Sequence, residues 1–216
     1  MRVVAIDGPA GAGKSTIARA LASRLGIPYL DTGAMFRVVA YSALRRGIHL
    51  DDEAAVAALA GRLSIRVTSE SVSVDGVDVT QEIRSSEVNA IVSHVAALSS
   101  VRSILREQQR VWAESNGGGV VEGRDIGTVV FPDAILKVFL TARPEIRAAR
   151  RVAEAGGDVD EVARSIAERD RLDSSRQDSP LARADGSVIV DTSDLSIPEV
   201  VELLAEMVAE RETRNG

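Results

Sequence analysis

Short apolar segments and longer amphipathic segments alternate along the chain from its first residues. The short segments are rich in Val, Ile and Leu and predict buried strands at residues 2–6, 27–30, 120–122, 135–140 and 187–190. The longer segments repeat apolar residues at helical spacing and predict helices at residues 17–25, 34–46, 51–63, 85–115, 143–154, 159–172 and 198–211. On the last helix this spacing directs Val200, Leu203, Leu204 and Met207 inward. Strands that alternate with helices form parallel sheets covered on both faces, so we predict an α/β fold with a five-stranded parallel sheet.

Between residues 64 and 81 the pattern changes from helical spacing to alternation. Val72, Val74 and Val77 alternate with polar residues, and Asp75-Gly76 separates two of the alternating runs. An Asp-Gly pair between alternating segments is a strong signal for a β-hairpin. We therefore predict a small antiparallel β insertion at about residues 64–84, within a single domain that spans residues 1–216.

A glycine-rich turn joins the first predicted strand to the first predicted helix. It matches the phosphate-binding pattern G-x-x-x-x-G-K-[ST] at every fixed position, with the strand before it and the helix after it that the pattern requires. In such a loop the backbone N–H groups and the helix N-terminus bind phosphate oxygens, Lys14 reaches the β- and γ-phosphates, and the Ser15 hydroxyl can ligate Mg²⁺. A nucleoside triphosphate with Mg²⁺ is therefore expected to bind Gly8, Pro9, Ala10, Gly11, Ala12, Gly13, Lys14, Ser15 and Thr16.

The composition is that of a soluble protein with a hydrophobic core. Of the 216 residues, 45% are hydrophobic and 27% are charged, and the formal net charge is −6. This acidic balance argues against extended nucleic-acid binding, and no apolar run reaches the roughly 18 residues of a membrane span. With no cysteine and only two histidines, thiolate chemistry, disulfides and multi-histidine metal sites are excluded. We expect a cytoplasmic monomer whose partners are small molecules, without nucleic acid or membrane among them.

Missing motifs exclude several classes of phosphate-loop protein. The chain lacks the N-K-x-D motif with which GTPases read guanine, an apolar strand that ends in Asp-Glu, and the signature of ABC transporters. Only two of its 26 basic residues are lysines, Lys14 and Lys137, so the lysine kept in the loop is informative. A small phosphotransferase is the class that remains. Two alternatives stay open: a kinase of another small metabolite, such as a shikimate kinase, and a non-catalytic module that senses ATP.

Five further segments carry specific motifs. They are Asp-Thr-Gly-Ala-Met-Phe-Arg at 31–37, Val-Ser-His-Val-Ala at 92–96, Val-Arg at 101–102, Gly-Arg-Asp-Ile-Gly-Thr-Val-Val-Phe-Pro at 123–132, and Glu-Arg-Asp at 168–170 followed by Asp173 and Arg176. With the glycine-rich loop, these motifs resemble the bacterial cytidylate kinases among the P-loop nucleoside monophosphate kinases, over almost the whole chain. The resemblance implies a P-loop kinase fold, with the β insertion in the monophosphate-binding region, and phosphoryl transfer from ATP to CMP or dCMP.

The resemblance also implies which residues bind the acceptor nucleotide. Arg37 stands where the family clamps the substrate phosphate, and a guanidinium can do this bidentately. Asp125 follows the strand predicted at 120–122, where ligands bind in open α/β sheets, and a carboxylate can accept a hydrogen bond from the cytosine amine. The set implied for substrate binding is Thr32, Arg37, Ser93, Arg102, Arg124, Asp125, Arg169, Asp173 and Arg176.

Within this set the implied roles differ. Ser93, Arg102 and Asp125 read the pyrimidine ring, and Arg124 and Arg176 face the phosphates. Arg169 and Asp173 contact the ribose hydroxyls, and with Arg176 they lie at i, i+4 and i+7 on one helix face. The chain departs from the family at two positions. Thr32 keeps the hydroxyl of the usual serine, whereas Phe36 lacks that of the usual tyrosine.

Arginines at helical spacing resemble the lid that closes over ATP in this family, which we expect at residues 143–160. Of these arginines, Arg147 and Arg151 are expected to act on ATP, while Asp7 or Glu122 is expected to orient water around the metal. The nucleophile is an ionised phosphate oxygen, so no general base is required. Catalysis is expected to rest on positioning and charge stabilisation by Lys14, Arg124, Arg147, Arg151 and Arg176.

Overall fold

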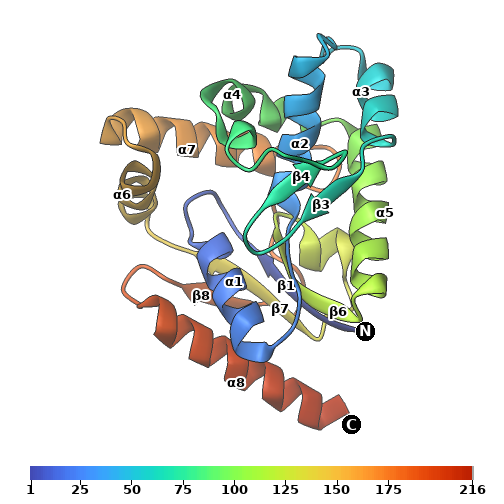
Figure 1. Cartoon of the computed structure of the whole chain (residues 1–216). Coiled ribbons are helices and arrows are strands. Elements are labelled where there is room, and N and C mark those ends of the chain that lie inside the picture. Colours follow the sequence, from blue (N-terminus) through green and yellow to red (C-terminus); the bar gives the residue numbers. More distant parts are fainter. Residues whose placement is uncertain (216) are drawn as a thin grey trace. The chain divides into compact units, whose positions relative to one another are not determined.

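The computed structural model describes residues 1–215 and divides the chain into two compact units (Figure 1). The first unit comprises Met1–Tyr29 and Asn116–Gly216, and the second comprises Leu30–Ser115. The second unit is therefore inserted in the sequence between the two parts of the first.

A five-stranded parallel sheet carries the first unit. Its strands are β1 (Arg2–Asp7), β2 (Tyr29–Asp31), β6 (Gly118–Gly123), β7 (Leu136–Thr141) and β8 (Val188–Asp191), in the order β2-β6-β1-β7-β8. β1 lies in the centre and pairs in parallel with β6 and β7, and β8 pairs in parallel with β7. This confirms the predicted α/β fold. Because the strands are parallel, the loops that follow β1, β6 and β7 start from the same edge of the sheet.

Two helices of the first unit pack together against this sheet, α1 (Lys14–Leu25) and α8 (Ile197–Asn215) (Figure 1). Ile17 and Leu21 of α1 are buried in one cluster with apolar side chains of β1, β7 and α8. The prediction for α8 was wrong at Leu203, which is 36% exposed. The buried stripe of this helix instead comprises Val200, Val201, Leu204, Ala205 and Val208.

The remaining elements of the first unit surround the loop edge of the sheet. The short π-helical turn η2 (Ile126–Val130) follows β6, and α6 (Pro144–Ala155) follows β7. α7 (Val159–Ser174) packs against α6 and precedes β8. The segment expected as a lid, residues 143–160, therefore falls on α6 and the start of α7.

The second unit combines helices with a small antiparallel sheet. Its helices are α2 (Thr32–Arg45), α3 (Glu53–Ala60), η1 (Glu82–Arg84), α4 (Ser86–Val95) and α5 (Ser99–Ser115). α2 packs against α4, and α3 packs against α5 (Figure 1). No single helix in residues 1–215 is long and apolar enough to cross a membrane, although α4 and α5 pass that test jointly, with a 97° bend between them.

The antiparallel sheet occupies the region predicted as an insertion. Its strands are β3 (Ile65–Val67), β4 (Val72–Val74) and β5 (Val77–Asp78), in that order. Asp75 and Gly76 form the two-residue turn between β4 and β5, with φ angles of 51° and 84°. Both angles are positive, as a type I′ turn requires, and Asp and Gly tolerate them better than most residues. The Asp-Gly signal therefore predicted the hairpin correctly.

Candidate active site

The glycine-rich loop runs from the end of β1 to the start of α1. Gly13 precedes the helix in a left-handed conformation, with φ 85°, and among the described residues no side chain caps this end. The first turn of α1 holds no acidic residue, and Ser15 and Thr16 are exposed there. Uncapped N–H groups and the positive end of the helix dipole are features that can bind an anion such as a phosphate.

Lys14 folds back over the loop that precedes it. Its side chain is buried, and its ammonium Nζ donates a hydrogen bond to the Pro9 carbonyl at 2.8 Å. Burial, together with the nearby Arg124 guanidinium, lowers the pKa of Lys14 to about 7, although the Glu122 carboxylate opposes the shift. A polyphosphate bound to the loop would favour the charged ammonium, because its negative charge would offset the nearby arginines and raise the pKa of Lys14.

Glu122 is the penultimate residue of β6, the strand next to β1. It is only 3% exposed, and its carboxylate accepts a hydrogen bond of 2.6 Å from the Tyr29 hydroxyl. Its charge favours the protonated form of Lys14. Glu122 therefore brings a buried negative charge to the phosphate-binding edge of the sheet.

Asp7 ends β1 and anchors the turn that follows β6. Both carboxylate oxygens accept backbone hydrogen bonds, from Ile126 N–H at 2.8 Å and from Gly127 N–H at 2.7 Å. Burial raises the pKa of Asp7 to about 6, although these two hydrogen bonds oppose the shift. The carboxylate thus holds the start of η2, directly after Arg124 and Asp125.

The raised pKa of Asp7 predicts a specific dependence of stability on pH. Between about pH 4 and pH 6 the folded chain binds a proton at Asp7 that the unfolded chain does not bind, so this contribution to stability grows as the pH falls. Over that range we expect wild type to gain about 2–3 kcal/mol in free energy of unfolding relative to Asp7→Asn. Urea unfolding of both proteins at several pH values measures the difference, and a difference independent of pH would contradict the assignment.

Asp173 gathers two arginines in the interior of the first unit. The carboxylate is 1% exposed, accepts a hydrogen bond from Arg124 Nε at 2.8 Å, and forms a second ion pair with Arg176. Burial alone would raise the pKa of Asp173, but Arg124, Arg176 and Arg169 outweigh it and lower the pKa. The predicted i+7 helical relation was wrong for Arg176, because α7 ends at Ser174 and Arg176 pairs with Asp173 from the following loop.

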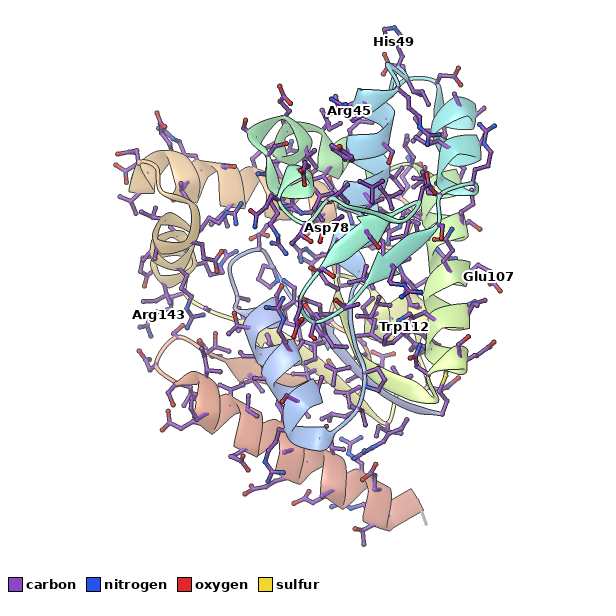
Figure 2. The ribbon with its side chains drawn as sticks, in the orientation of Figure 1. Arg45, His49, Asp78, Glu107, Trp112 and Arg143 are labelled. Carbon is purple, nitrogen blue, oxygen red and sulfur yellow. The ribbon has the colours of Figure 1, made fainter. Side chains whose placement is uncertain are left out.

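The arginines of the expected lid have protein partners. Arg143 is at the surface and forms two hydrogen bonds with Asp194, at 2.7 and 2.8 Å (Figure 2). Arg151 pairs with Glu154 on the same exposed helix face. Arg147 and Arg150 instead turn toward the glycine-rich loop and its surroundings: Arg147 pairs with Asp170 and donates to the Ala10 carbonyl, and Arg150 binds Thr192.

In the second unit, Arg37 is held by two neighbouring elements. α2 begins at Thr32, which is buried, and its N-cap Asp31 accepts a hydrogen bond from Ala34 N–H. One turn later, the Arg37 guanidinium donates to the Ile83 carbonyl at 3.1 Å and to Asn89 Oδ1 at 2.7 Å. η1 and α4 therefore fix the direction of a partly buried cation.

Arg102 and Ser93 also belong to the second unit. Arg102 on α5 is 4% exposed, and its guanidinium donates to the Ala96 carbonyl at 3.0 Å. The same guanidinium lies over the Phe36 ring, with 5.4 Å between Cζ and the ring centroid. Phe36 therefore offers a cation–π contact, although it has no hydroxyl to donate. Ser93 is partly buried on α4.

Comparison with known proteins identifies the family. A sequence profile described as cytidylate kinase matches residues 4–210. The chain belongs to the cytidylate kinase family. Cytidylate kinases of Streptomyces avermitilis and Mycobacterium leprae are each 48% identical to it. The first alignment covers 97% of this chain and 93% of the relative, and the second covers 97% and 96%.

Two solved structures have the same fold as this member of the cytidylate kinase family. A protein from Eubacterium ventriosum superposes with a TM-score of 0.55 at 11% identity, covering 97% of this chain and 99% of the other. A protein from Thermus thermophilus superposes with a TM-score of 0.51 at 20% identity, covering 97% of both chains. At such low identity the likeness concerns the fold alone.

The predicted site residues of this cytidylate kinase family member fall into two groups. Within the first unit, electrostatic interactions link the lysine and arginines of the site to two carboxylates. This group comprises Lys14, Glu122, Arg124, Arg169, Asp173 and Arg176. Arg37, Ser93 and Arg102 lie in the second unit. The two histidines join neither group, and His49 points outward from the loop after α2 (Figure 2).

Sequence analysis missed three partners of these residues. Tyr29 binds Glu122, Asn89 binds Arg37, and Asp170 binds both Arg147 and the Ala10 N–H. Asp170 lies inside the Glu-Arg-Asp motif, which was the available signal. Tyr29 and Asn89 carried no signal, because their partners are 93 and 52 residues away in the sequence.

Proposed function

We propose that the chain transfers the γ-phosphoryl group of MgATP to CMP and dCMP, forming ADP with CDP or dCDP. The observation that carries the proposal is the group of Arg124, Arg169 and Arg176 around the buried Asp173, with Lys14 near Arg124 and Arg169 at the uncapped start of α1. Membership of the cytidylate kinase family supports the choice of acceptor.

The arrangement suits a reaction that needs positioning and positive charge. The attacking group is a phosphate oxygen that is ionised at neutral pH, so the absence of a general base is consistent with the chemistry. Lys14 stabilises the negative charge on the β- and γ-phosphates. Arg124 and Arg176, which share Asp173, neutralise the charge that spreads over the transferring group.

Mg²⁺ fits the oxygen donors present at this edge of the sheet. A bound ion would supply positive charge that neutralises the phosphates of the nucleotide. The exposed Ser15 hydroxyl is the direct ligand that the chain offers. Asp7 and Glu122 are the two carboxylates considered for orienting metal-bound water; Asp7 also accepts two backbone hydrogen bonds, and Glu122 accepts one from the Tyr29 hydroxyl.

The acceptor nucleotide is assigned to the residues that match the family motifs. Arg37 binds its phosphate, and Thr32 supplies a hydroxyl at the start of α2. Asp125, Arg102 and Ser93 read the cytosine ring. Arg169 and Asp173 are assigned to the sugar, and Asp173 also orients two arginines through its ion pairs. The β insertion at about 64–84 would enlarge the acceptor region, and residues 143–160 would form the lid over ATP, where Arg151 is the more exposed candidate.

Asp125→Asn is expected to change base selection more than ATP affinity. The carboxylate accepts a hydrogen bond from the cytosine amine, whereas an amide can donate to the uracil carbonyl. Losing one charged hydrogen bond costs about 1.5–3 kcal/mol, which lowers kcat/KM for CMP by roughly ten- to a hundredfold. Steady-state kinetics with CMP and UMP on both proteins give the ratio. If the CMP-to-UMP ratio stayed the same, base reading would belong to another residue.

A panel of acceptors tests the proposal against its alternatives. In a coupled assay that detects ADP, we expect CMP and dCMP to be the best substrates, and shikimate and gluconate to be inactive. Turnover of a non-nucleotide acceptor would favour a kinase of another metabolite. ATP binding without turnover of any acceptor would favour a nucleotide-sensing module.

We further propose that the enzyme works as a cytoplasmic monomer on small molecules alone, in line with its net charge of −6.

A further inference from the structure

Both backbone polar groups of Ala10, in the glycine-rich loop, form hydrogen bonds with side chains of α6 and α7. The Ala10 N–H donates to Asp170 Oδ1 at 3.0 Å, and the Ala10 carbonyl accepts from Arg147 Nη1 at 3.1 Å. Arg147 and Asp170 also form an ion pair with each other, and both side chains are mostly buried. α6 and α7 thus supply a charged pair that closes around one residue of the loop.

A second attachment fixes the loop two residues later. The Ala12 carbonyl lies 3.2 Å from Thr192 Oγ1, which is also 3.1 Å from the Thr141 carbonyl and shares its single proton between them. Arg150 donates to Thr192 Oγ1 at 2.9 Å and to the Thr192 carbonyl at 2.7 Å. Thr192 is 1% exposed, so these hydrogen bonds are shielded from water.

Peptide geometry connects these attachments to phosphate binding. A trans peptide is planar, and its C=O and N–H bonds point in opposite directions. Directing the Ala10 carbonyl toward Arg147 therefore turns the Gly11 N–H away from α6. Directing the Ala12 carbonyl toward Thr192 turns the Gly13 N–H away from β8 in the same manner. The two attachments thus set the direction of alternate donors in the loop.

The close packing of α6 on the loop supports this role. A Cβ atom at Gly11 would lie 2.9 Å from both the Cβ and the carbonyl oxygen of Arg147, so the helix touches the loop backbone. Gly11 also has a φ of +75°, which side chains rarely adopt. The loop backbone and α6 are therefore in direct contact at the residue that forms the ion pair with Asp170.

We propose that Asp170 and Thr192 are positioning residues for ATP: they hold the Ala10 and Ala12 peptides so that the Gly11 and Gly13 N–H groups are preorganised for the triphosphate. This inference deepens the proposed function and rests on it only for the identity of ATP as the donor. Arg147 binds the Ala10 carbonyl directly and is held there by its ion pair with Asp170, whereas Arg150 acts through Thr192.

Paired substitutions test the proposal. Asp170→Ala removes both contacts of the carboxylate, whereas Asp170→Asn keeps an acceptor for the Ala10 N–H. Thr192→Val removes the hydroxyl, whereas Thr192→Ser keeps it. Glu168→Ala is the control on α7, because it removes an exposed carboxylate that pairs with Arg171 on the same helix. MgATP affinity is measured by calorimetry without acceptor, and KM values for ATP and CMP and the melting temperature are measured alongside.

We expect Asp170→Ala and Thr192→Val to weaken MgATP binding by about ten- to a hundredfold, with KM for CMP changed less than about twofold. Asp170→Asn should lose less affinity, and Thr192→Ser and Glu168→Ala should stay close to wild type. Lower melting temperatures with unchanged ATP affinity would overturn the proposal in favour of a purely structural role. Tighter ATP binding would also overturn it, because the carboxylate would then compete with phosphate. Calorimetry does not depend on CMP turnover, so failure of the proposed function would be detected separately.

Discussion

Replacing Lys14 with alanine or arginine is expected to lower kcat by at least about a hundredfold while leaving the fold intact. The lysine is buried, and its ammonium Nζ lies 2.8 Å from the Pro9 carbonyl. The positive charge therefore lies close to the backbone of the glycine-rich loop. A guanidinium keeps the charge but is planar and wider than an ammonium. It cannot occupy the same position without displacing the loop. Steady-state kinetics and thermal melts of both variants give the two quantities.

The other lysine of the chain supplies the matched control. Lys137→Arg changes a side chain on β7 whose stem packs beside Gly127, and an arginine has an equivalent stem. This control should keep near wild-type turnover. If Lys14→Arg also kept near wild-type turnover, Lys14 would be an ordinary cation beside the phosphates, and the role assigned to its compact ammonium would be wrong.

Asp173→Ala is expected to impair both stability and catalysis strongly. Removing one partner of a buried ion pair costs about 3–5 kcal/mol, and Asp173 serves two arginines at 1% exposure. Without the carboxylate, Arg124 and Arg176 repel each other and lose their orientation toward the transferring group. We expect kcat to fall by about a hundredfold or more with either CMP or dCMP. Urea unfolding and kinetics on both substrates measure the effects.

The comparison of CMP with dCMP separates the two roles of Asp173. An additional loss for CMP, beyond the loss for dCMP, measures a hydrogen bond to the 2′-hydroxyl. Equal losses would remove Asp173 from 2′-hydroxyl recognition and leave the orientation of the arginines as its role. Small losses on both substrates, matching those of Glu168→Ala on the same helix, would contradict both roles.

The sequence predicted the features that depend on local interactions. The strand, glycine-rich turn and helix around Lys14 are adjacent along the chain, and the Asp75-Gly76 turn depends only on its own backbone angles. The helices predicted within 85–115 are α4 and α5, but the pattern did not give the boundary between them. Ser99 and Ser100 mark the second start, and Glu53 from another helix accepts hydrogen bonds from both the N–H and the hydroxyl of Ser100. Periodicity alone does not reveal such a contact.

Sequence patterns did not predict contacts between side chains that lie far apart in the sequence. Asp173 resembles an ordinary member of a solvated ion-pair ladder in sequence, yet it is buried with Arg124, which is 49 residues away. Asp170 likewise occupies a polar helix and contacts a loop 160 residues earlier. The strand predicted at 120–122 begins earlier, at Gly118, because glycines there let β6 approach β1 closely. In each case the decisive partner comes from a distant segment that the fold brings near.

The transfer of a phosphoryl group from ATP to CMP is tested most directly by ³¹P NMR of the purified chain with Mg²⁺, ATP and CMP. We predict that the resonances of ADP and CDP grow in equal amounts, that neither grows without CMP, and that Lys14→Ala abolishes both. Formation of ADP and inorganic phosphate without CDP, or an unchanged spectrum with both CMP and dCMP, would contradict the proposed reaction.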